Sequence, residues 1–256
     1  MVNLWNLVIL RPMLNGLLAL ASILPEEVEF GLAIIILTLV VRVASTPLVM
    51  RQLKSTKAMQ EMQPKVQELQ KKYGKNKQKL QQEMMKVYKE AGVNPIGCMW
   101  PMLVQFPIWI ALYQSIMRAL ATTPENLLGL AQHLYSSERI AQAIPVNSHF
   151  LWLDLGQPDR TLILAILVGG TMWVQQKMTT APSADPRQQS TSSTMLLMMP
   201  LMFGMFTMMF PSGLPLFWLV SNLIGIATQY FVTGGWGYLK PPAVSSSART
   251  APRKRH

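Results

Sequence analysis

The run from Val28 to Met50 constrains this chain most, because it is long, apolar and yet contains an arginine. At about 1.5 Å of rise per residue, a helix over this run can cross a hydrocarbon layer of roughly 30 Å. Arg42 lies within it, and no Asp, Glu or His occurs between Phe30 and Met50. An arginine inside a membrane span costs roughly 2.5–3.5 kcal/mol to insert, which makes Arg42 a candidate functional residue.

Two interpretations of Arg42 are open at this point. A helix that ends at Thr46-Pro47 would leave the guanidinium near the interface, where its aliphatic stem lets the charge reach water. Alternatively, Arg42 faces water held inside the membrane. The polar residues Thr38, Ser45 and Thr46 share its helix face, and this favours the hydrated cavity.

The composition is that of a membrane protein. Half of the 256 residues are hydrophobic and 14% are charged, whereas about a quarter of the residues of a soluble domain are charged. The long uncharged runs predict an all-α membrane protein with five transmembrane helices. The expected spans are Val28 to Met50, Ile96 to Met117, Thr161 to Gln176, Thr194 to Phe210 and Leu214 to Val232. No internal repeat is evident, which weakens an inverted-repeat transporter interpretation.

The distribution of basic residues predicts the orientation. Between Arg51 and Val93 there are eleven Lys and Arg residues against four glutamates, whereas the loop 122–158 has one basic residue, Arg139. The tail from Lys240 to His256 is basic as well. Since short basic loops stay in the cytoplasm, we expect 51–93 and the C-terminus inside a bacterial-type cell membrane and the N-terminus outside.

Three regions follow from these patterns. Residues 1–27 are expected outside, as an interfacial helix and an acidic collar. Their apolar stretch also faintly resembles a signal peptide, but Pro12, Asn15 and Gly16 interrupt it, so the interfacial helix is favoured. Residues 28–233 are expected to form the five-span core, and 234–256 the basic cytoplasmic tail.

The basic segment 51–93 carries two helical repeats, which end at Gly74 and Gly92. They predict an antiparallel hairpin within the core, kinked at Pro64. The hairpin is either a topology signal or a surface for polyanions and anionic lipid headgroups. Candidate contacts are Lys71, Lys72, Lys75, Lys77 and Lys79, with Arg253, Lys254 and Arg255 in the tail.

The sequence offers no catalytic pattern. His133, His149 and His256 lie outside the expected spans, as do essentially all carboxylates, and arginine does not titrate at physiological pH. No metal-ligand cluster, phosphate loop or nucleophile–base pair is present. The single cysteine, Cys98, allows no intrachain disulfide. We therefore expect a protein that is not an enzyme and that uses neither cofactor nor metal.

Uncharged polar residues within the spans are the remaining candidates. Each alone usually tethers two helices, but together with Arg42 they could line a polar hollow. The helical phase places Thr38, Arg42 and Thr46 on one face, and Trp218, Asn222 and Gln229 on another. The candidate groove residues are Arg42, Thr38, Thr46, Gln105, Gln175, Gln176, Trp218 and Asn222.

Several motifs resemble the YidC insertase family over roughly Arg11 to Val232. The first three are Val-Arg42-Val-Ala-Ser-Thr-Pro47-Leu, Met62-Gln-Pro64-Lys-Val-Gln and Gln82-Glu-Met-Met-Lys-Val-Tyr-Lys. The others are Val93-Asn-Pro-Ile-Gly97, Gln105-Phe-Pro107-Ile, Asp185-Pro-Arg-Gln-Gln and Phe210-Pro-Ser-Gly-Leu-Pro-Leu-Phe-Trp218-Leu-Val-Ser-Asn222. The chain looks like the five-span core of that family.

The resemblance implies insertion and assisted folding of membrane proteins, alone or beside the Sec translocon. It places Arg42 in a hydrophilic groove open to the cytoplasm and the lipid, lined also by Trp218 and by Gln175 or Gln176. It further implies nascent membrane proteins as substrates, contact with ribosomes through the basic tail from Lys240 to His256, and targeting-receptor machinery as a partner. A channel or transporter using the same cavity, and a passive assembly scaffold, are the alternatives.

Overall fold

The computed structural model describes residues 4–74, 76–92, 100–120, 124–180, 186–233 and 235–239. These residues are mostly helical, with one short β-hairpin. The helices are α1 (Arg11–Ala21), α2 (Glu29–Glu61), α3 (Gln63–Tyr73), α4 (Lys77–Glu90), α5 (Trp100–Ala119), α6 (Pro124–Ala131), α7 (Glu138–Gln142), α8 (Ile163–Thr179), α9 (Pro186–Thr207) and α10 (Gly213–Thr233). Strands β1 (His149–Phe150) and β2 (Leu153–Asp154) pair antiparallel, with His149 opposite Asp154.

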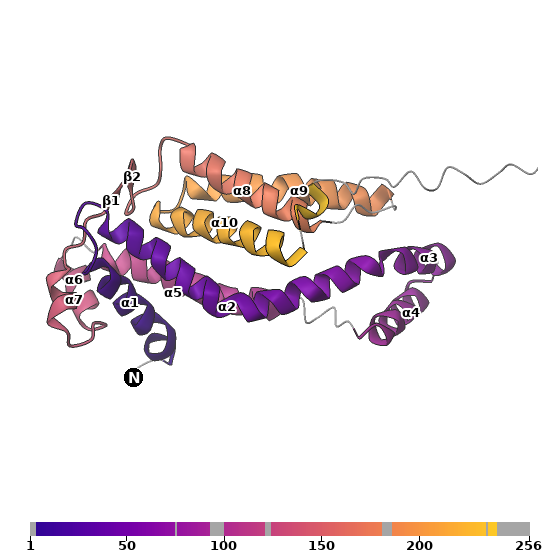
Figure 1. The fold of residues 1–256 in the computed structure, drawn as a ribbon, viewed down its shortest axis with the longest axis horizontal. Coiled ribbons are helices and arrows are strands. Elements are labelled where there is room, and N and C mark those ends of the chain that lie inside the picture. The colour runs from indigo at the N-terminus through magenta and orange to yellow at the C-terminus, as the bar shows by residue number, and fades with distance from the viewer. Residues whose placement is uncertain are drawn as a thin grey trace, which may run out of the picture.

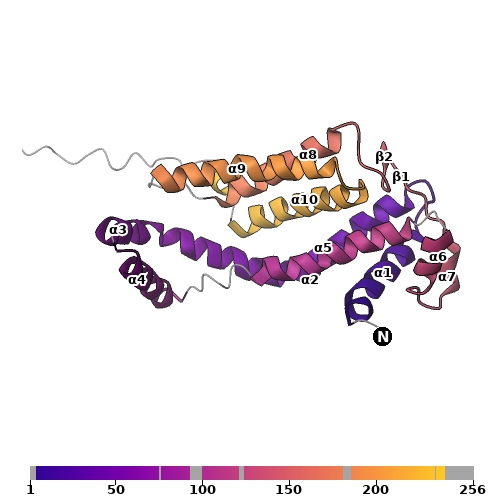
Figure 2. The ribbon, with the colours of Figure 1, turned by 180° about the vertical axis from the view of Figure 1, so that it is seen from behind.

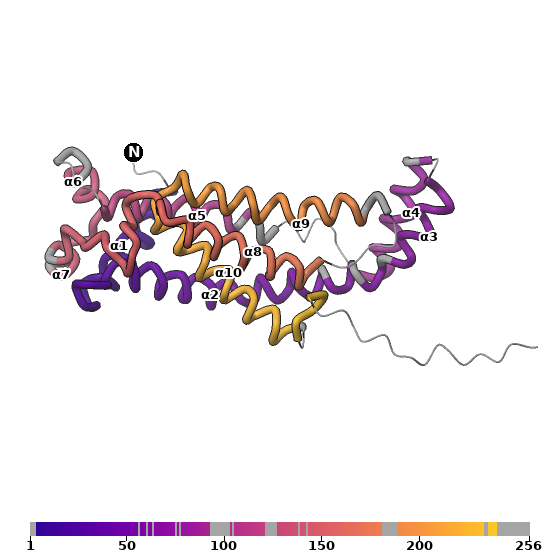
Figure 3. The backbone as a smooth tube through the Cα atoms, turned by 90° about the horizontal axis from the view of Figure 1, so that it is seen from above, coloured from indigo at the N-terminus to yellow at the C-terminus, as the bar shows by residue number. Residues whose placement is uncertain are grey.

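The long helices form two layers in an elongated molecule (Figures 1 and 2). One layer holds α2 and α5, and the other holds α8, α9 and α10. Helix α8 packs on α9 and α10, and α10 also packs on α2. Helix α1 packs against α2 and α5 on the side away from α8. Helices α3 and α4 lie at one end of the molecule, and α6, α7 and the β-hairpin lie at the other (Figures 1 and 3).

Helix α2 continues beyond the expected limit of the first span. It runs through Pro47 and past Met50 to Glu61, because good helix formers follow the apolar run. The kink expected at Pro64 is instead a break in the helix. Helix α2 ends at Glu61, and Pro64 occupies the first turn of α3, where a missing backbone N–H costs no hydrogen bond.

The other expected spans correspond to α5, α8, α9 and α10, with ends that differ by a few residues; α9 begins earlier, at Pro186. The start of the second span, Ile96, lies outside the described residues. Two helices of the described part of the chain are long and apolar enough to cross a membrane, Glu29–Met59 and Gly213–Val232. Helix α8 has 17 residues.

The apolar core occupies the end of the molecule that carries α6, α7 and the β-hairpin. Buried side chains from α1, α2, α5, α8 and α10 meet there, and they include Leu14, Leu17, Phe30, Ile34, Leu112, Ile116, Leu164, Val168, Leu214 and Phe217. The β-hairpin packs on the first turn of α2. A Cβ on Gly31 would lie 2.1 Å from the Phe150 ring, so only glycine fits this contact. The Glu29 carboxylate accepts the Asn147 N–H at 2.8 Å.

Helices α8 and α9 approach closely through two glycines. A Cβ on Gly169 would lie 3.1 Å from the Pro200 carbonyl oxygen, and one on Gly204 would lie 3.2 Å from the Ala165 carbonyl oxygen. Small residues let backbones of membrane helices approach, which strengthens their dispersion contacts. This interface fixes α8, whose C-terminal half lines the site described below.

Helices α3 and α4 pack against each other and meet at Tyr73. The ammonium groups of Lys72 and Lys79 lie 5.4 and 5.3 Å from the centre of its ring, and the Asn76 side chain accepts the Lys79 N–H to cap α4. Lys71 lies in the last turn of α3. Lys75, Arg253, Lys254 and Arg255 lie outside the described residues, as does the side chain of Lys77.

Candidate functional site

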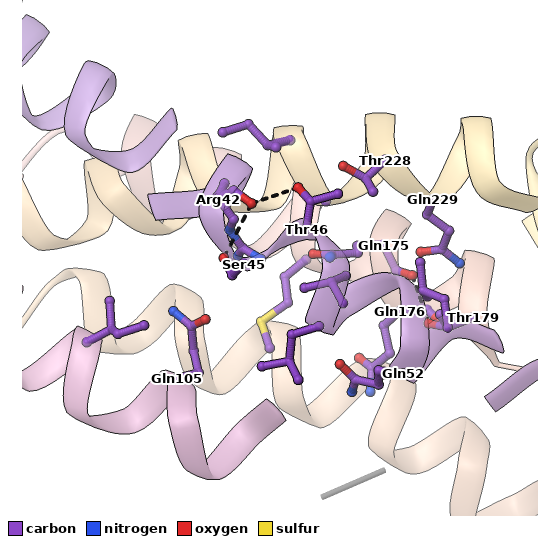
Figure 4. Close-up of a pocket in the computed structure, with 17 residues that line it drawn as sticks. Arg42, Ser45, Thr46, Gln52, Gln105, Gln175, Gln176, Thr179, Thr228 and Gln229 are labelled. Atoms are coloured by element: carbon purple, nitrogen blue, oxygen red, sulfur yellow. Dashed lines mark hydrogen bonds between the residues drawn. The ribbon is translucent and has the colours of Figure 1, made fainter. Parts of the chain in front are cut away.

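A polar pocket of about 440 Å³ opens between α2, α5, α8 and α10. The middle of α2, the C-terminal halves of α8 and α10 and the N-terminal half of α5 surround it, so it lies away from the β-hairpin end of the molecule. Its polar lining residues are labelled in Figure 4: Arg42, Ser45, Thr46, Gln52, Gln105, Gln175, Gln176, Thr179, Thr228 and Gln229. Apolar side chains such as Leu48, Ile108, Met172 and Ile224 complete the wall.

Arg42 is the only charged residue among those that line the pocket. Its Nε is buried and has no hydrogen-bond partner within the described part of the chain. The Thr46 hydroxyl donates to the Arg42 carbonyl oxygen at 2.8 Å, and the Ser45 hydroxyl lies 3.3 Å from the same oxygen. These hydroxyls therefore satisfy the helix backbone. The Arg42 guanidinium faces the pocket, and no carboxylate is among the described residues that line it (Figure 4).

Both glutamines at the end of α8, Gln175 and Gln176, line the pocket. Their side chains contact different helices. The Gln175 amide lies against Gly225 of α10, where an added Cβ would lie 2.2 Å from its Nε2. The Gln176 Nε2 points to the Met199 sulfur of α9 at 3.7 Å, and the Gln176 Oε1 is buried without a partner within the described residues. The structure thus brings both candidates to one space.

Three of the sequence candidates lie outside the pocket lining. Thr38 is 1% exposed and donates its hydroxyl to the Ile34 carbonyl oxygen at 2.6 Å. Asn222 joins α10 to α8, with its Nδ2 lying 3.2 Å from the Thr171 hydroxyl. Trp218 is 8% exposed and packs among aromatic rings. The residues brought together are Arg42, Thr46, Gln105, Gln175 and Gln176.

An aromatic cluster lies on the apolar side of the pocket. The Trp218 ring is 5.2 Å from Trp109 and 5.2 Å from Phe203, measured between ring centroids, and 6.2 Å from Phe210. Tyr113 in turn meets Phe210 at 5.9 Å. These rings lie between the pocket residues of α10 and the buried core around Leu214 and Phe217. Packed aromatic and aliphatic side chains therefore lie behind the pocket on this side.

Two further polar residues that line the pocket, Gln52 and Thr228, were not predicted from the sequence. Gln52 lies on the face of Arg42 and Ser45, three turns along α2, beyond the limit expected for the first span. Thr228 lies one turn after Gly225, next to Gln229 on α10. Extending the 3.6-residue period of the first span past Met50 predicts Gln52 on this side of the helix.

The chemistry of the lining is that of a hydrogen-bonding site. Among the described residues no group of three His, Cys, Asp or Glu side chains is placed to hold a metal ion. The pocket instead offers carboxamides, hydroxyls and one permanent cation in a partly enclosed space. Carboxamides and hydroxyls both donate and accept hydrogen bonds, so this space suits a polar, uncharged or acidic segment.

Comparison with known proteins identifies the family. Residues 22–236 match the family model described as 60Kd inner membrane protein. The chain is 37% identical over 237 residues to the membrane protein insertase YidC 2 of Bacillus anthracis, covering 91% of this chain and 82% of that protein. It is 36% identical over 234 residues to the membrane protein insertase MisCA of Bacillus subtilis, covering 90% of this chain and 79% of that protein.

A second kind of relative is much longer. The membrane protein insertase YidC of Histophilus somni is 38% identical over 231 residues, which are 90% of this chain and 38% of that protein. The chain therefore spans about two fifths of this relative and about four fifths of the two Bacillus proteins. The family match covers the whole pocket, from Arg42 to Gln229. The chain belongs to the 60Kd inner membrane protein family, the family of the YidC membrane protein insertases.

Proposed function

We propose that this chain inserts integral membrane proteins into a bacterial-type cell membrane and helps them fold. The observation that carries the proposal is the polar pocket that contains Arg42 between α2, α5, α8 and α10, with packed aromatic side chains behind it. The relatives' names, membrane protein insertase, support the activity. A pocket in which polar groups can stay solvated reduces the cost of moving a polar segment through hydrocarbon.

We propose a five-span topology in which α2, α5, α8, α9 and α10 cross the membrane. Helices α3 and α4 then lie in the cytoplasm, and α6, α7 and the β-hairpin lie outside, with α1 along the outer surface. The charge asymmetry supports this orientation, since eleven basic residues lie between 51 and 93 and one lies in the loop 122–158. In this orientation the pocket faces the cytoplasm and the lipid, and the aromatic cluster closes it toward the outside.

The proposed mechanism has two steps. A polar external segment of the substrate first enters the pocket from the cytoplasm, and Arg42 attracts acidic residues in that segment. The apolar helix of the substrate then slides past α8 and α10 into the lipid. Burial of its apolar surface, at about 25 cal/mol per Å², drives this second step. The chain itself consumes no nucleotide in this scheme.

Nascent membrane proteins are the proposed substrates, and the Sec translocon, the ribosome and targeting receptors are proposed partners. The basic surface at the tip of the proposed α3–α4 hairpin, with Lys71, Lys72 and Lys79, also supports contact with anionic lipid headgroups. Each basic residue near an anionic surface contributes about 1 kcal/mol. This contact would hold the hairpin beside the membrane, below the mouth of the pocket.

Insertion into vesicles that contain this chain alone tests the proposal. A small single-span protein with an acidic external segment should insert faster than into empty vesicles. Arg42→Ala should slow it about fivefold, because a charge attraction of about 1 kcal/mol is lost, and Arg42→Lys should retain much of the rate. Arg118→Ala is the matched control, since Arg118 lies at the far end of α5, outside the pocket. Equal rates with and without the chain would refute the proposal.

A further inference from the structure

The pocket is rich in carboxamides. Five glutamines from four helices line it, and no carboxylate is among the lining residues. They are Gln52 of α2, Gln105 of α5, Gln175 and Gln176 of α8, and Gln229 of α10. Figure 4 shows them around the same space as Arg42. Attraction of acidic side chains requires a cation and does not require five neutral carboxamides.

A carboxamide has the same hydrogen-bonding groups as a peptide unit, an N–H donor and a C=O acceptor. A polypeptide in transit has one of each at nearly every residue, and it loses water partners for all of them when it leaves the aqueous phase. Side-chain carboxamides can replace those partners whatever the side chains of the segment are. The pocket therefore offers a chemistry that matches the backbone.

Two of the carboxamides are placed to take a ligand. The Gln176 Oε1 is buried with no hydrogen-bond partner within the described residues, and its Nε2 reaches only the weakly accepting Met199 sulfur at 3.7 Å. A buried acceptor without a partner is costly, and a ligand N–H would remove that cost. The neighbouring Gln175 amide lies over Gly225, where even a methyl group would displace it.

We infer that the pocket binds the peptide backbone of the segment in transit through Gln175 and Gln176, with Gly225 positioning the Gln175 amide. The inference rests on the proposed function, because it requires that a polypeptide segment enters the pocket. Recognition of the backbone is independent of sequence, and the charge preference of Arg42 is added to it. Segments with neutral external residues are then bound as well, although Arg42 contributes nothing to them.

The test removes backbone donors without changing side chains. A synthetic single-span peptide with a neutral external segment is compared with a second peptide in which two amides of that segment are esters, so that each loses its N–H. Vesicles containing the full chain should insert the ester peptide about fivefold more slowly than the amide peptide, the factor that corresponds to about one net hydrogen bond. Rates in empty vesicles are subtracted, because esters also change spontaneous insertion.

Variants of the chain test whether Gln175 and Gln176 accept the hydrogen bonds that the peptide N–H groups donate. With Gln175→Leu and Gln176→Leu combined, the amide peptide should insert as slowly as the ester peptide, so the difference between them disappears. Gly225→Ala should reduce the difference in part, because the Gln175 side chain can shift without backbone movement. The matched control combines Gln81→Leu and Gln82→Leu, two exposed neighbours on α4 outside the pocket. This control should keep the full difference.

The outcomes of this test separate the inference from the proposed function. An unchanged ester penalty in the Gln175/Gln176 variant, or no penalty with the original chain, would overturn backbone recognition while insertion itself stands. If the original chain inserts the acidic test protein but not the neutral amide peptide, backbone recognition is overturned and the proposed function stands. If it inserts neither, the proposed function is overturned and this inference with it. Thermal unfolding of each variant in detergent micelles should match the original chain, which excludes misfolding as the cause of a lost difference.

Discussion

At the residue scale, Asp159 fixes the start of α8. Its carboxylate accepts the Thr161 N–H and hydroxyl at 2.9 and 2.7 Å and the Leu164 N–H at 3.0 Å. Burial alone would raise the pKa of this carboxyl, but the three hydrogen bonds outweigh it and hold the pKa below its ordinary value. A negative charge at the N-terminus of a helix is also stabilised by the helix dipole.

We expect Asp159→Asn to lower the free energy of unfolding by about 1 kcal/mol at neutral pH. Because the folded-state pKa lies below the unfolded-state pKa, the ionised carboxylate stabilises the fold above the unfolded-state value. That contribution is lost as the pH falls through the folded-state pKa. Thermal unfolding in detergent, followed between pH 7 and pH 3, should show the variant and the original chain converging at the acid end.

Glu27→Gln provides the control for this measurement. Glu27 is exposed and lies on the same proposed outer side. Its removal should change neither the unfolding temperature nor its pH dependence. A constant offset between Asp159→Asn and the original chain across the whole pH range would show that ionisation of Asp159 does not stabilise the fold.

At the scale of elements, the close approach of α8 and α9 should be intolerant of added volume. Gly169→Val places methyl groups against the Pro200 carbonyl oxygen, which a Cβ alone already approaches to 3.1 Å. A backbone carbonyl cannot rotate away, so the helices must separate. We expect a loss of about 1–3 kcal/mol of stability, measured as a lower unfolding temperature in detergent.

Gly170 offers a matched control within the same helix. No heavy atom lies within 4 Å of a Cβ placed on it, so Gly170→Val should leave the unfolding temperature nearly unchanged. Both variants alter helix propensity by the same amount, and only Gly169→Val meets a neighbouring backbone. Equal effects of the two substitutions would show that packing of α9 on α8 does not depend on this glycine.

The helices could be predicted from the sequence because apolar runs and breakers mark them directly. The fifth span was expected from Leu214 to Val232, and α10 extends one residue further at each end, from Gly213 to Thr233. A helix was expected to stop at Gly74, and α3 ends at Tyr73, one residue earlier. The membership of the pocket was harder to predict. Helical phase gives the direction of a side chain but not its depth along the bundle, so Trp218 and Gln229 share a face of α10 while only Gln229 lines the pocket.

Features that depend on a second helix could not be predicted from a single run of residues. Gly169 and Gly225 look alike in the sequence, yet one meets the Pro200 backbone and the other the Gln175 amide. The docking of Phe150 on Gly31 joins residues far apart in the chain. The residue pairing across helices is set by three-dimensional packing, which periodicity does not encode.

At the scale of the whole molecule, the proposed orientation predicts which segments a protease can reach. Trypsin added to sealed, right-side-out vesicles should leave 51–93 intact despite its eleven basic residues, because this segment is expected in the cytoplasm. Inverted vesicles should be cleaved there rapidly. Arg139, in the loop 122–158 expected outside, should show the opposite pattern. Cleavage between Arg51 and Val93 in right-side-out vesicles would reverse the orientation and place the pocket mouth on the outer side.

One mechanical consequence follows from the length of α2. The same uninterrupted helix lines the pocket at Arg42 and ends at Glu61, directly before α3. From Pro47 to Glu61 it is about 20 Å long at 1.5 Å per residue. Pro47 removes one backbone hydrogen bond, so the helix bends more easily at this point. A rotation of about 10° there displaces the end of the helix by roughly 3–4 Å. The helix is a lever arm. A force applied to the pocket wall at Arg42 would therefore also displace the end of α2, where α3 begins.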